Sequence, residues 1–171
     1  MKYDEGIINY AVYKNGEESC GIAEVTLPDI SRITQEIKGA GILGTFNSPV
    51  MGAFEAMTLT LNFRTPRKEQ FSLLRQGEHL IDLRAAQQVR DTVSGEIKAV
   101  PVKHVMRVTA VKQSNGKVAT ASTADGSGEY AVSYYATYID GEKVLEIDIF
   151  NNVCVIDGVD EMAAVRSALG K

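Results

Sequence analysis

The stretch YAVSYYATYIDGEKVLEIDIF, running from Tyr130 to Phe150, decides the fold class of this 171-residue chain. Its first half places an apolar or aromatic residue at every second position, which is the period of a half-buried strand: Tyr130, Val132, Tyr134, Ala136 and Tyr138. Its second half alternates in the same way, with Leu145, Ile147 and Ile149 set against Glu146 and Asp148. The pair Asp140-Gly141 separates the two runs and predicts a hairpin, because both central residues of such a turn need positive φ.

Other stretches extend the predicted sheet. MTLTLNFR, from Met57 to Arg64, has the same alternation, and NNVCVID, residues 151–157, continues the sheet after a bend. Weaker strand patterns occupy five further ranges: Ile7–Tyr13, Gly21–Leu27, Ile33–Lys38, His79–Arg84 and Val102–Val111. The polar, Gly/Ser-rich residues 112–130 predict a loop or a loosely held hairpin.

A short helix is predicted after the Met57–Arg64 strand. Thr65 is a suitable cap, Pro66 suits the first helical position, and the helix ends before Gly77. Its apolar stripe consists of Phe71 and Leu74.

A second short helix is predicted near the C-terminus, capped by Asp160 and stopped by Gly170. Its apolar side consists of Met162, Val165 and Leu169. Neither helix is long enough to be stable alone, so both must pack on the sheet. The sequence has no repeat of 20–50 residues and no linker, and we expect one mostly-β domain over residues 1–171.

The composition narrows the class of function. The chain is 44% apolar and 23% charged, which is ordinary for a globular protein. Its net charge of −4 argues against a non-specific nucleic-acid binder, because such binding depends on Lys and Arg. Cys20 and Cys154 lie in apolar runs, so we interpret them as free and buried, with a single disulfide as the alternative. The start has no signal-peptide pattern and no run reaches 18 apolar residues, so we expect folding in a cytoplasm without membrane insertion.

KGAGILGTF, from Lys38 to Phe46, contains Gly39-x-Gly41-x-x-Gly44, the glycine spacing of a dinucleotide-binding loop. Such a loop follows a buried strand and opens a helix. Here the preceding SRITQEIK is largely polar, and Pro49 disfavours a helix afterwards. We therefore expect no cofactor, and interpret the glycines as a flexible or sharply bent loop whose backbone approaches a neighbour closely.

Few residues suggest a catalytic or metal-binding site. His79 and His104 match no metal-ligand pattern, and no motif of a catalytic nucleophile occurs. Glu146 and Asp148 share a strand face at roughly 6.6–7 Å, a spacing compatible with glycoside hydrolysis, although a solvated strand face is the favoured interpretation. RTPRK, residues 64–68, is the densest basic cluster and is interpreted as a surface patch. We expect neither a metal site nor an enzyme.

Two features favour an assembly protein. The predicted loop from Gly39 to Phe54 contains more apolar residues than a solvated loop normally carries: Ile42, Leu43, Phe46, Val50, Met51 and Phe54. The many strands show few devices that protect sheet edges, and unprotected edges pair with other chains. We therefore expect neighbouring copies to complete the loop and the edges, either in closed rings or in open filaments.

Three segments resemble the major tail tube protein of contractile-tailed phages. They are GIAEVTLPDISR (Gly21–Arg32), KGAGILG (Lys38–Gly44) and YYATYIDGEKVLEIDIFNNVCVIDGVDEMAAVRSALG (Tyr134–Gly170), and together they cover about a third of the chain. The last is the most specific, because a tyrosine-bearing strand, an Asp-Gly turn, a Glu-Ile-Asp strand, a GVD step and a short helix ending in glycine follow in the order of that family.

The resemblance implies a tail-tube-type β-sandwich or barrel with one or two short packed helices. Its strands would complete a ring-wide inner β-barrel in hexameric rings, an architecture shared by type VI secretion tube proteins. The rings would stack into a rigid tube that ejects DNA in a phage or punctures an envelope in a bacteriocin. Implied partners are the sheath protein, the baseplate tube initiator, the tape measure and the tail terminator. The particle would assemble in the host cytoplasm, without cofactor or catalysis.

By position, the resemblance assigns an inter-ring loop with glycines at its base and apolar contacts beyond: Gly39, Gly41 and Gly44, then Ile42, Leu43, Phe46, Val50 and Met51. We further expect Glu146 and Asp148, or another acidic strand face, to line the lumen and to keep DNA from sticking by like-charge repulsion. The alternative function is a monomeric, β-rich module that binds a small ligand, and a hydrolase using the same two carboxylates ranks third.

Overall fold

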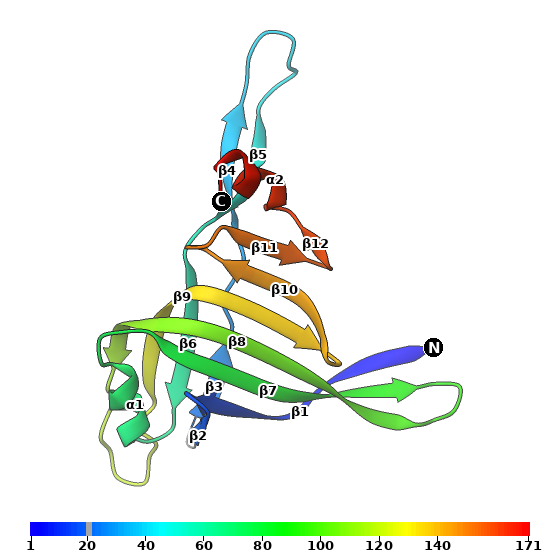
Figure 1. Ribbon diagram of the computed structural model, residues 1–171. Helices are drawn as coiled ribbons and strands as arrows, with labels where there is room; N and C mark the ends of the chain where they lie inside the picture. Colours follow the sequence, from blue (N-terminus) through cyan, green and yellow to red (C-terminus); the bar gives the residue numbers. More distant parts are fainter. Residues whose placement is uncertain (20–21) are drawn as a thin grey trace.

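The computed structural model describes residues 1–19 and 22–171, and it consists mainly of antiparallel strands (Figure 1). The strands are β1 (Lys2–Lys14), β2 (Glu17–Ser19), β3 (Ile22–Thr26), β4 (Arg32–Ile37), β5 (Phe46–Phe54), β6 (Met57–Phe63), β7 (His79–Asp91), β8 (Ile97–Ser114), β9 (Gly126–Ile139), β10 (Glu142–Asp148), β11 (Val153–Ile156) and β12 (Val159–Asp160). The two helices are α1 (Lys68–Leu73) and α2 (Ala163–Ala168). The predicted mostly-β class with two short helices is confirmed.

The main sheet has the order β12-β11-β10-β9-β8-β7-β1-β2, and β6 and β3 branch from it at β9. The first part of β9, Gly126–Val132, pairs with β6, whereas Tyr134–Ile139 pairs with β10. The opposite edge of β9 pairs with β8 along nearly its whole length. Since β6 and β3 share one apolar core with β1, β7 and β8, they form a second layer over the sheet. β4 and β5 form a separate two-stranded sheet.

The core lies between these layers. Every second residue of β6 is buried, as its alternation predicts: Met57, Leu59, Leu61 and Phe63. Ile81 of β7, Met106 and Val108 of β8, and Tyr130 of β9 face them from the sheet. Each fully buried large apolar side chain contributes about 1.5–3 kcal/mol to folding. The core therefore depends on contacts between strands that are far apart in the sequence.

The predicted single face of β9 is wrong beyond Ser133. The register with β8 shifts there, because Arg107 pairs with Tyr134 while Val108 pairs with Val132. The extra residue is a β-bulge, which reverses the alternation. Tyr130 and Val132 therefore face the core, whereas Tyr134 and Tyr138 lie on the opposite face and Tyr135 replaces them inside.

The predicted loop from Gly39 to Phe54 is also wrong in its second half, which is strand β5 paired with β4. Pro49 is tolerated because it lies in a two-stranded sheet, where a strand has an unpaired side. Likewise the loop predicted over 112–130 shortens to 115–125, since its ends continue β8 and begin β9. β7 and β8 extend beyond their predicted ranges and pair as a long hairpin. The added part of β7 includes polar residues such as Gln87, which is paired with Val100 but does not belong to an alternating apolar pattern.

Both helices are displaced from their predicted starts. The N-cap of α1 is Arg67, so neither Thr65 nor Pro66 begins it. Its buried residues are Gln70 and Leu73, whereas the predicted stripe of Phe71 and Leu74 is about half exposed. Gln70 packs against Gly126 of β9, so tertiary contact rather than apolar periodicity orients the helix.

Asp160 is likewise not the N-cap of α2, which is Met162. Asp160 lies two residues earlier, where its carboxylate accepts the N–H of Met162 at 3.0 Å. Gly170, with φ of 72°, follows the C-cap Leu169, so the predicted stop is confirmed.

Leu61→Ala should lower the free energy of unfolding of the isolated subunit by about 2–5 kcal/mol, because Leu61 is fully buried. The matched control is Leu43→Ala, which removes the same atoms from a fully exposed position and should change it by less than about 0.5 kcal/mol. Urea unfolding followed by circular dichroism measures both. Equal effects would contradict the placement of the core.

Candidate assembly surfaces

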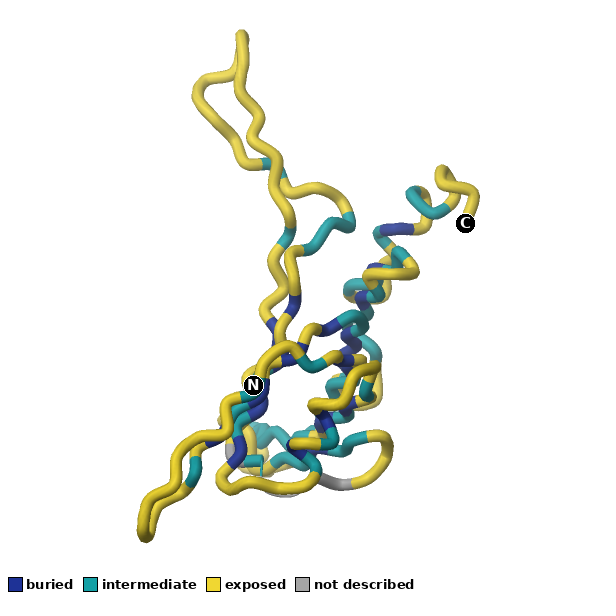
Figure 2. The backbone as a smooth tube through the Cα atoms, turned by 90° about the vertical axis from the view of Figure 1, so that its left-hand side faces the viewer, coloured by how far each residue is buried: buried dark blue, intermediate teal, exposed yellow. Residues whose placement is uncertain are grey.

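The β4–β5 hairpin projects from the body of the molecule, and nearly all of its length is exposed (Figure 1, Figure 2). Its pairing runs from Arg32 opposite Phe54 to Ile37 opposite Phe46. Exposed apolar side chains lie along both strands and the tip: Ile33, Ile37, Ile42, Leu43, Phe46, Val50 and Met51. An apolar surface of this extent on a projecting element is typical of a protein contact site.

The three glycines of the GxGxxG pattern lie in the tip of this hairpin. Gly41 and Gly44 have φ of 87° and 106°, which non-glycine residues rarely adopt. A Cβ at Gly39, Gly41 or Gly44 would meet no described atom within 4 Å, so the close backbone approach expected from the sequence does not occur within the subunit. The pattern joins two antiparallel strands and therefore lacks the helix N-terminus that a dinucleotide pyrophosphate needs.

The base of the hairpin is fixed to the C-terminal segment. The Arg32 guanidinium lies 3.0 Å from a Glu161 carboxylate oxygen and stacks over the Phe54 ring, 5.2 Å from its centroid. Gly52 has φ of 66°, and a Cβ there would lie 1.9 Å from Sδ of Met162. The direction in which the hairpin projects is therefore set by contacts at its base, and Gly52 admits no side chain without displacing Met162.

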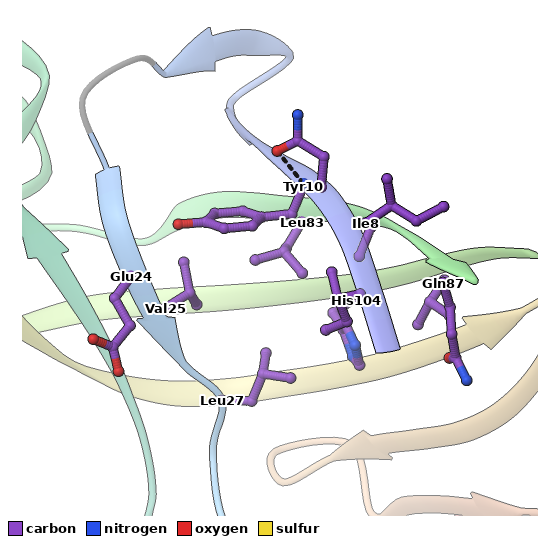
Figure 3. A pocket seen from close by; sticks show the side chains of 12 residues that line it. Ile8, Tyr10, Glu24, Val25, Leu27, Leu83, Gln87 and His104 are labelled. Atoms are coloured by element: carbon purple, nitrogen blue, oxygen red, sulfur yellow. Dashed lines mark hydrogen bonds between the residues drawn. The ribbon is translucent and has the colours of Figure 1, made fainter. Parts of the chain in front are cut away.

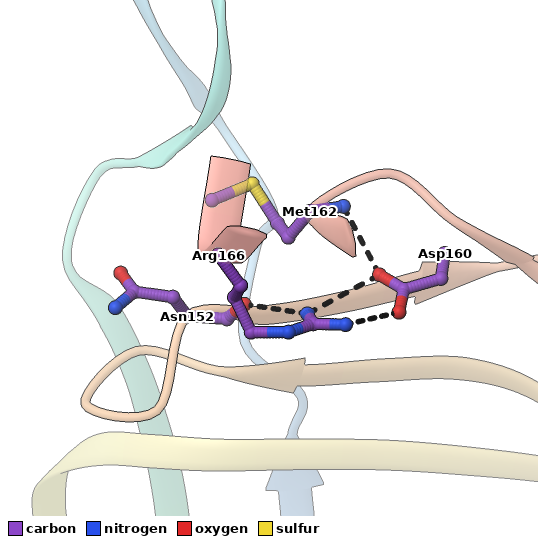
Figure 4. A network of polar contacts seen from close by, with 4 residues as sticks. All are labelled: Asn152, Asp160, Met162 and Arg166. Carbon is purple, nitrogen blue, oxygen red and sulfur yellow. Dashed lines mark hydrogen bonds and ion pairs between the residues drawn. The ribbon is translucent and has the colours of Figure 1, made fainter. Parts of the chain in front are cut away.

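A polar network holds the C-terminal segment itself (Figure 4). The Arg166 guanidinium donates to the Asp160 carboxylate and, at 2.9 Å, to the carbonyl of Asn152 in the β10–β11 turn. The hydrogen bond from Arg166, supported by the N–H of Met162, lowers the pKa of Asp160 below its usual value. The network ties α2 to the strands beneath it.

The second candidate surface is a polar one, on the face of the main sheet opposite the core. Strand register places nine residues of β1, β7, β8, β9 and β10 on this face, which we call the paired-charge face: Tyr13, Asp82, Arg84, Lys103, Arg107, Tyr134, Tyr138, Lys143 and Glu146.

Contacts on the paired-charge face follow one another across the strands. Arg84 lies 3.0 Å from Asp82 and stacks over the ring of Tyr13. Lys103 lies 3.7 Å from the same Asp82 and over the ring of Tyr138. Arg107 stacks over the ring of Tyr134 in the same way. Because the cations contact a carboxylate or an aromatic ring of the same subunit, the field above the face is weaker than their number suggests.

The two predicted lumen-facing acids, Glu146 and Asp148, lie on this opposite face, as the strand register with β9 requires. The Glu146 carboxylate accepts hydrogen bonds from Lys143 at 2.7 Å and from the Tyr134 hydroxyl at 3.3 Å. Asp148 accepts from the backbone and side-chain nitrogens of Asn151. Both carboxylates are engaged in structural contacts, and the face around them also carries four cations rather than being purely acidic.

The remaining candidate residues have structural partners. His79 donates to the carbonyl of Arg75 at 3.0 Å, and the Tyr135 hydroxyl lies 2.9 Å from Nδ1 of His104. Burial lowers the pKa of His104. Within residues 1–19 and 22–171, no group of three His, Cys, Asp or Glu side chains could hold a metal ion.

Cys154 is free and buried, as the sequence indicates, and burial raises the pKa of its thiol. Cys20, also predicted to be free and buried, lies outside the described residues. No helix in the described part of the chain is long and apolar enough to cross a membrane.

The fold defines a class of protein. Two solved cryo-EM structures from an extracellular contractile injection system, PVC, share it: the sheath/tube terminator in the extended state, at a TM-score of 0.56, and the sheath–tube complex in the extended state, at 0.53. The first is 14% identical and covers 80% of this chain and 97% of its own; the second is 13% identical and covers 76% and 88%. The architecture is thus the tube fold of contractile injection systems.

The family follows from the sequence match. The model of the family described as phage tail tube protein FII matches residues 4–170, so this chain belongs to that family. The tail tube protein of Escherichia phage P2 is 26% identical over 164 residues, which cover 93% of each chain. The chain is therefore a structural tail tube protein of a contractile, phage-like system and not an enzyme.

Acid should weaken the C-terminal network through Asp160. Because its pKa is lowered in the folded state, the stabilisation is complete above the usual aspartate pKa of about 3.9 and is lost as the pH falls through the lowered value. Asp160→Asn should therefore flatten the decline of the urea midpoint between pH 6 and pH 2.5. Asp125→Asn, at an exposed carboxylate 3.8 Å from Lys117, is the control and should keep the wild-type decline. Identical profiles for all three proteins would contradict the role of Asp160.

Proposed function

We propose that this subunit assembles into hexameric rings that stack into the rigid inner tube of a contractile tail. The observation that carries this proposal is the apolar β4–β5 hairpin, which reaches beyond the body and buries little of its surface within the subunit. A surface of this kind on one end of a molecule suits a head-to-tail contact with the next copy. Membership of the tail tube family supplies the kind of assembly.

Ring closure is supported by the ends of the main sheet. One end is the two-residue strand β12, and the other is the three-residue strand β2. Strands this short leave most of the neighbouring backbone edge unpaired, and such edges pair with other chains. In the proposed ring each subunit lends strands to one continuous inner β-barrel. Neighbouring copies would pair along β12 and along β1 from Lys2 to Gly6, which leaves the edge of β1 from Ile7 to Tyr10 open.

The paired-charge face is proposed to line the channel, together with Glu146 and Asp148. The reason is that β3 and β6 cover the opposite face of the sheet, whereas the contacts on this face are made by its own side chains. Instead of a purely acidic wall, the channel would present carboxylates that balance nearby cations. A wall of this kind holds a passing polyanion weakly, because few cations are free to pair with phosphate.

The proposed particle is a phage tail that ejects DNA or a DNA-free bacteriocin that punctures an envelope. The proposed partners are the sheath protein around the tube, the baseplate initiator below it, the tape measure inside it and the terminator above it. The structural neighbours support the sheath and the terminator, since one belongs to a sheath–tube complex and the other is a sheath/tube terminator. Assembly would take place in the host cytoplasm.

Stacking should fail when the hairpin tip becomes polar. Ile42→Asp combined with Leu43→Asp should give folded subunits or single rings, because charged side chains cannot be buried against the next ring. Negative-stain microscopy at high protein concentration measures tube length. Val118→Asp, at a fully exposed site in the 115–125 loop, is the matched control and should form normal tubes. If the hairpin variant forms tubes of normal length, the proposed role of the hairpin in stacking is contradicted.

Reversing the two acids should make the channel retain DNA. Glu146→Lys with Asp148→Lys replaces two negative charges by two positive charges in each subunit and releases Lys143 from its partner. At low salt, tubes of this variant should bind a short duplex DNA with at least tenfold higher affinity than wild-type tubes. This affinity should fall steeply as the salt concentration rises. Fluorescence anisotropy measures the binding, and Glu142→Lys, at the exposed β9–β10 turn, is the control. Unchanged binding would mean that these carboxylates do not face the channel.

A further inference from the structure

A groove of about 540 Å³ opens between β1 and β3 (Figure 3). β1 and β3 form its two walls, and side chains of β7 and β8 form its floor. The lining is mainly apolar, with Ile7 and Ile8 on one wall, Val25 on the other, and Leu83 on the floor. His104 also reaches the floor, and because burial lowers its pKa it is neutral at pH 7. The groove therefore suits an uncharged, apolar occupant.

Both walls are strand edges. Among the described strands, β3 pairs with β6 alone, and β1 from Lys2 to Ala11 pairs with β7 alone, so each has one free edge. The Tyr10 hydroxyl, 3.4 Å from the carbonyl of Ile22, bridges the two strands. Free backbone N–H and C=O groups on both walls favour an occupant that carries a strand edge of its own, because such an edge can pair with them.

The wall formed by β1 is irregular in a way that exposes apolar surface. Its register with β7 shifts between Asp4 and Gly6 and again between Ile7 and Asn9. The second shift is a bulge at Ile8, which allows the consecutive residues Ile7 and Ile8 both to line the groove. They remain 69% and 55% exposed in the subunit, so a partner would bury them.

We propose that this groove receives the tip of the β4–β5 hairpin of a second copy of this chain in the next ring. The inference rests on the stacking of rings proposed above, and it names the surface that the hairpin contacts. The hairpin projects from one end of the molecule, whereas β1 and β3 lie toward the other end (Figure 1). Identical subunits stacked in the same orientation bring such opposite ends together, and the contact repeats from ring to ring.

The chemistry of the two surfaces matches. The hairpin offers exposed Ile42 and Leu43 in its turn, exposed Phe46 at the start of β5, and an outer edge on each strand that its partner leaves unpaired. The groove offers apolar walls with free backbone edges. Lys38, at the start of the tip, lies 3.6 Å from Glu36 of its own hairpin in an exposed pair, and such pairs contribute little. Lys38 therefore remains able to contact Glu24, which lies on the outer side of β3 at the rim of the groove and has no ion pair with a described residue. Burying these side chains against the groove removes apolar surface of both subunits from water, which favours the contact.

Cysteine cross-linking of assembled tubes tests the contact. In a Cys20→Ser background, Leu43→Cys with Ile8→Cys should form disulfides under mild oxidation, since Cys154 is buried. Because the contact joins successive rings, non-reducing gels should show a ladder of covalent chains that continues beyond six subunits. Leu43→Cys with Val118→Cys is the matched control, with two equally exposed thiols, and should give no ladder. Each single-cysteine variant should also stay monomeric on the gel.

The outcomes separate this inference from the proposed function. Normal tubes without a ladder would overturn the groove assignment and leave the tube role intact. A ladder that stops at six would place the hairpin on a neighbour within the same ring, which also overturns it. Wild-type protein that forms neither rings nor tubes would instead contradict the proposed function. If the double variant does not assemble, Ile8→Asp decides: it should give rings without stacks, and normal tubes from it would overturn the proposal.

Discussion

Strand β9 hydrogen-bonds with three other strands, and this divided partnership determines the rest of the fold. Its first half holds β6 and its second half holds β10, while β8 follows its opposite edge. The bulge at Ser133 marks the change of partner, and it also turns Tyr135 into the core and Tyr134 out of it. Without this change one strand could not serve both the covering layer and the sheet that continues to β12. The burial of Tyr135 and the exposure of Tyr134 and Tyr138 on the paired-charge face are therefore consequences of this bulge. Lys143 and Glu146 share that face because of a second register shift, between Lys143 and Leu145.

The β4–β5 hairpin is a marginal element whose direction is nevertheless fixed. A two-stranded sheet with exposed apolar side chains has little stability of its own. Here it is anchored at its base by Arg32, Glu161, Phe54 and Met162, so that its direction is fixed while its tip remains free. The acid-sensitive bond between Asp160 and Arg166 steadies the segment that carries this anchor. Contact with the next subunit would then cost less ordering entropy, because the hairpin is already aligned.

The absence of catalysis in this family agrees with how its titratable side chains are used in the described residues. Glu146 and Asp148 have a spacing that could serve glycoside hydrolysis, yet hydrogen bonds from Lys143, Tyr134 and Asn151 occupy them. The paired-charge face uses carboxylates to restrain cations rather than to transfer protons. If this face lines the proposed channel, it would hold a passing polyanion weakly, because few of its cations are free to pair with phosphate.

Sequence patterns were sufficient to predict the class of fold, the Asp140-Gly141 hairpin, the alternating core of β6, the stop at Gly170 and the family. These features are local, since each depends on residues adjacent in the chain or on a motif read letter by letter. The sequence also located the apolar segment from Ile42 to Met51, because apolar residues next to glycine and proline are visible without a structure.

Which side chains share a face, and which surfaces lie at opposite ends, depends on how distant strands pair and pack. The bulges at Ser133 and Ile8 are not signalled by composition, because they arise from how two distant strands fit in register. Gln70 is buried in place of Phe71 for the same reason, since Gly126 leaves room for it from another strand. β5 is not predicted from the sequence, because its residues do not alternate between apolar and polar and it pairs with β4 alone. Register and packing are properties of pairs of segments, and a single segment does not contain them.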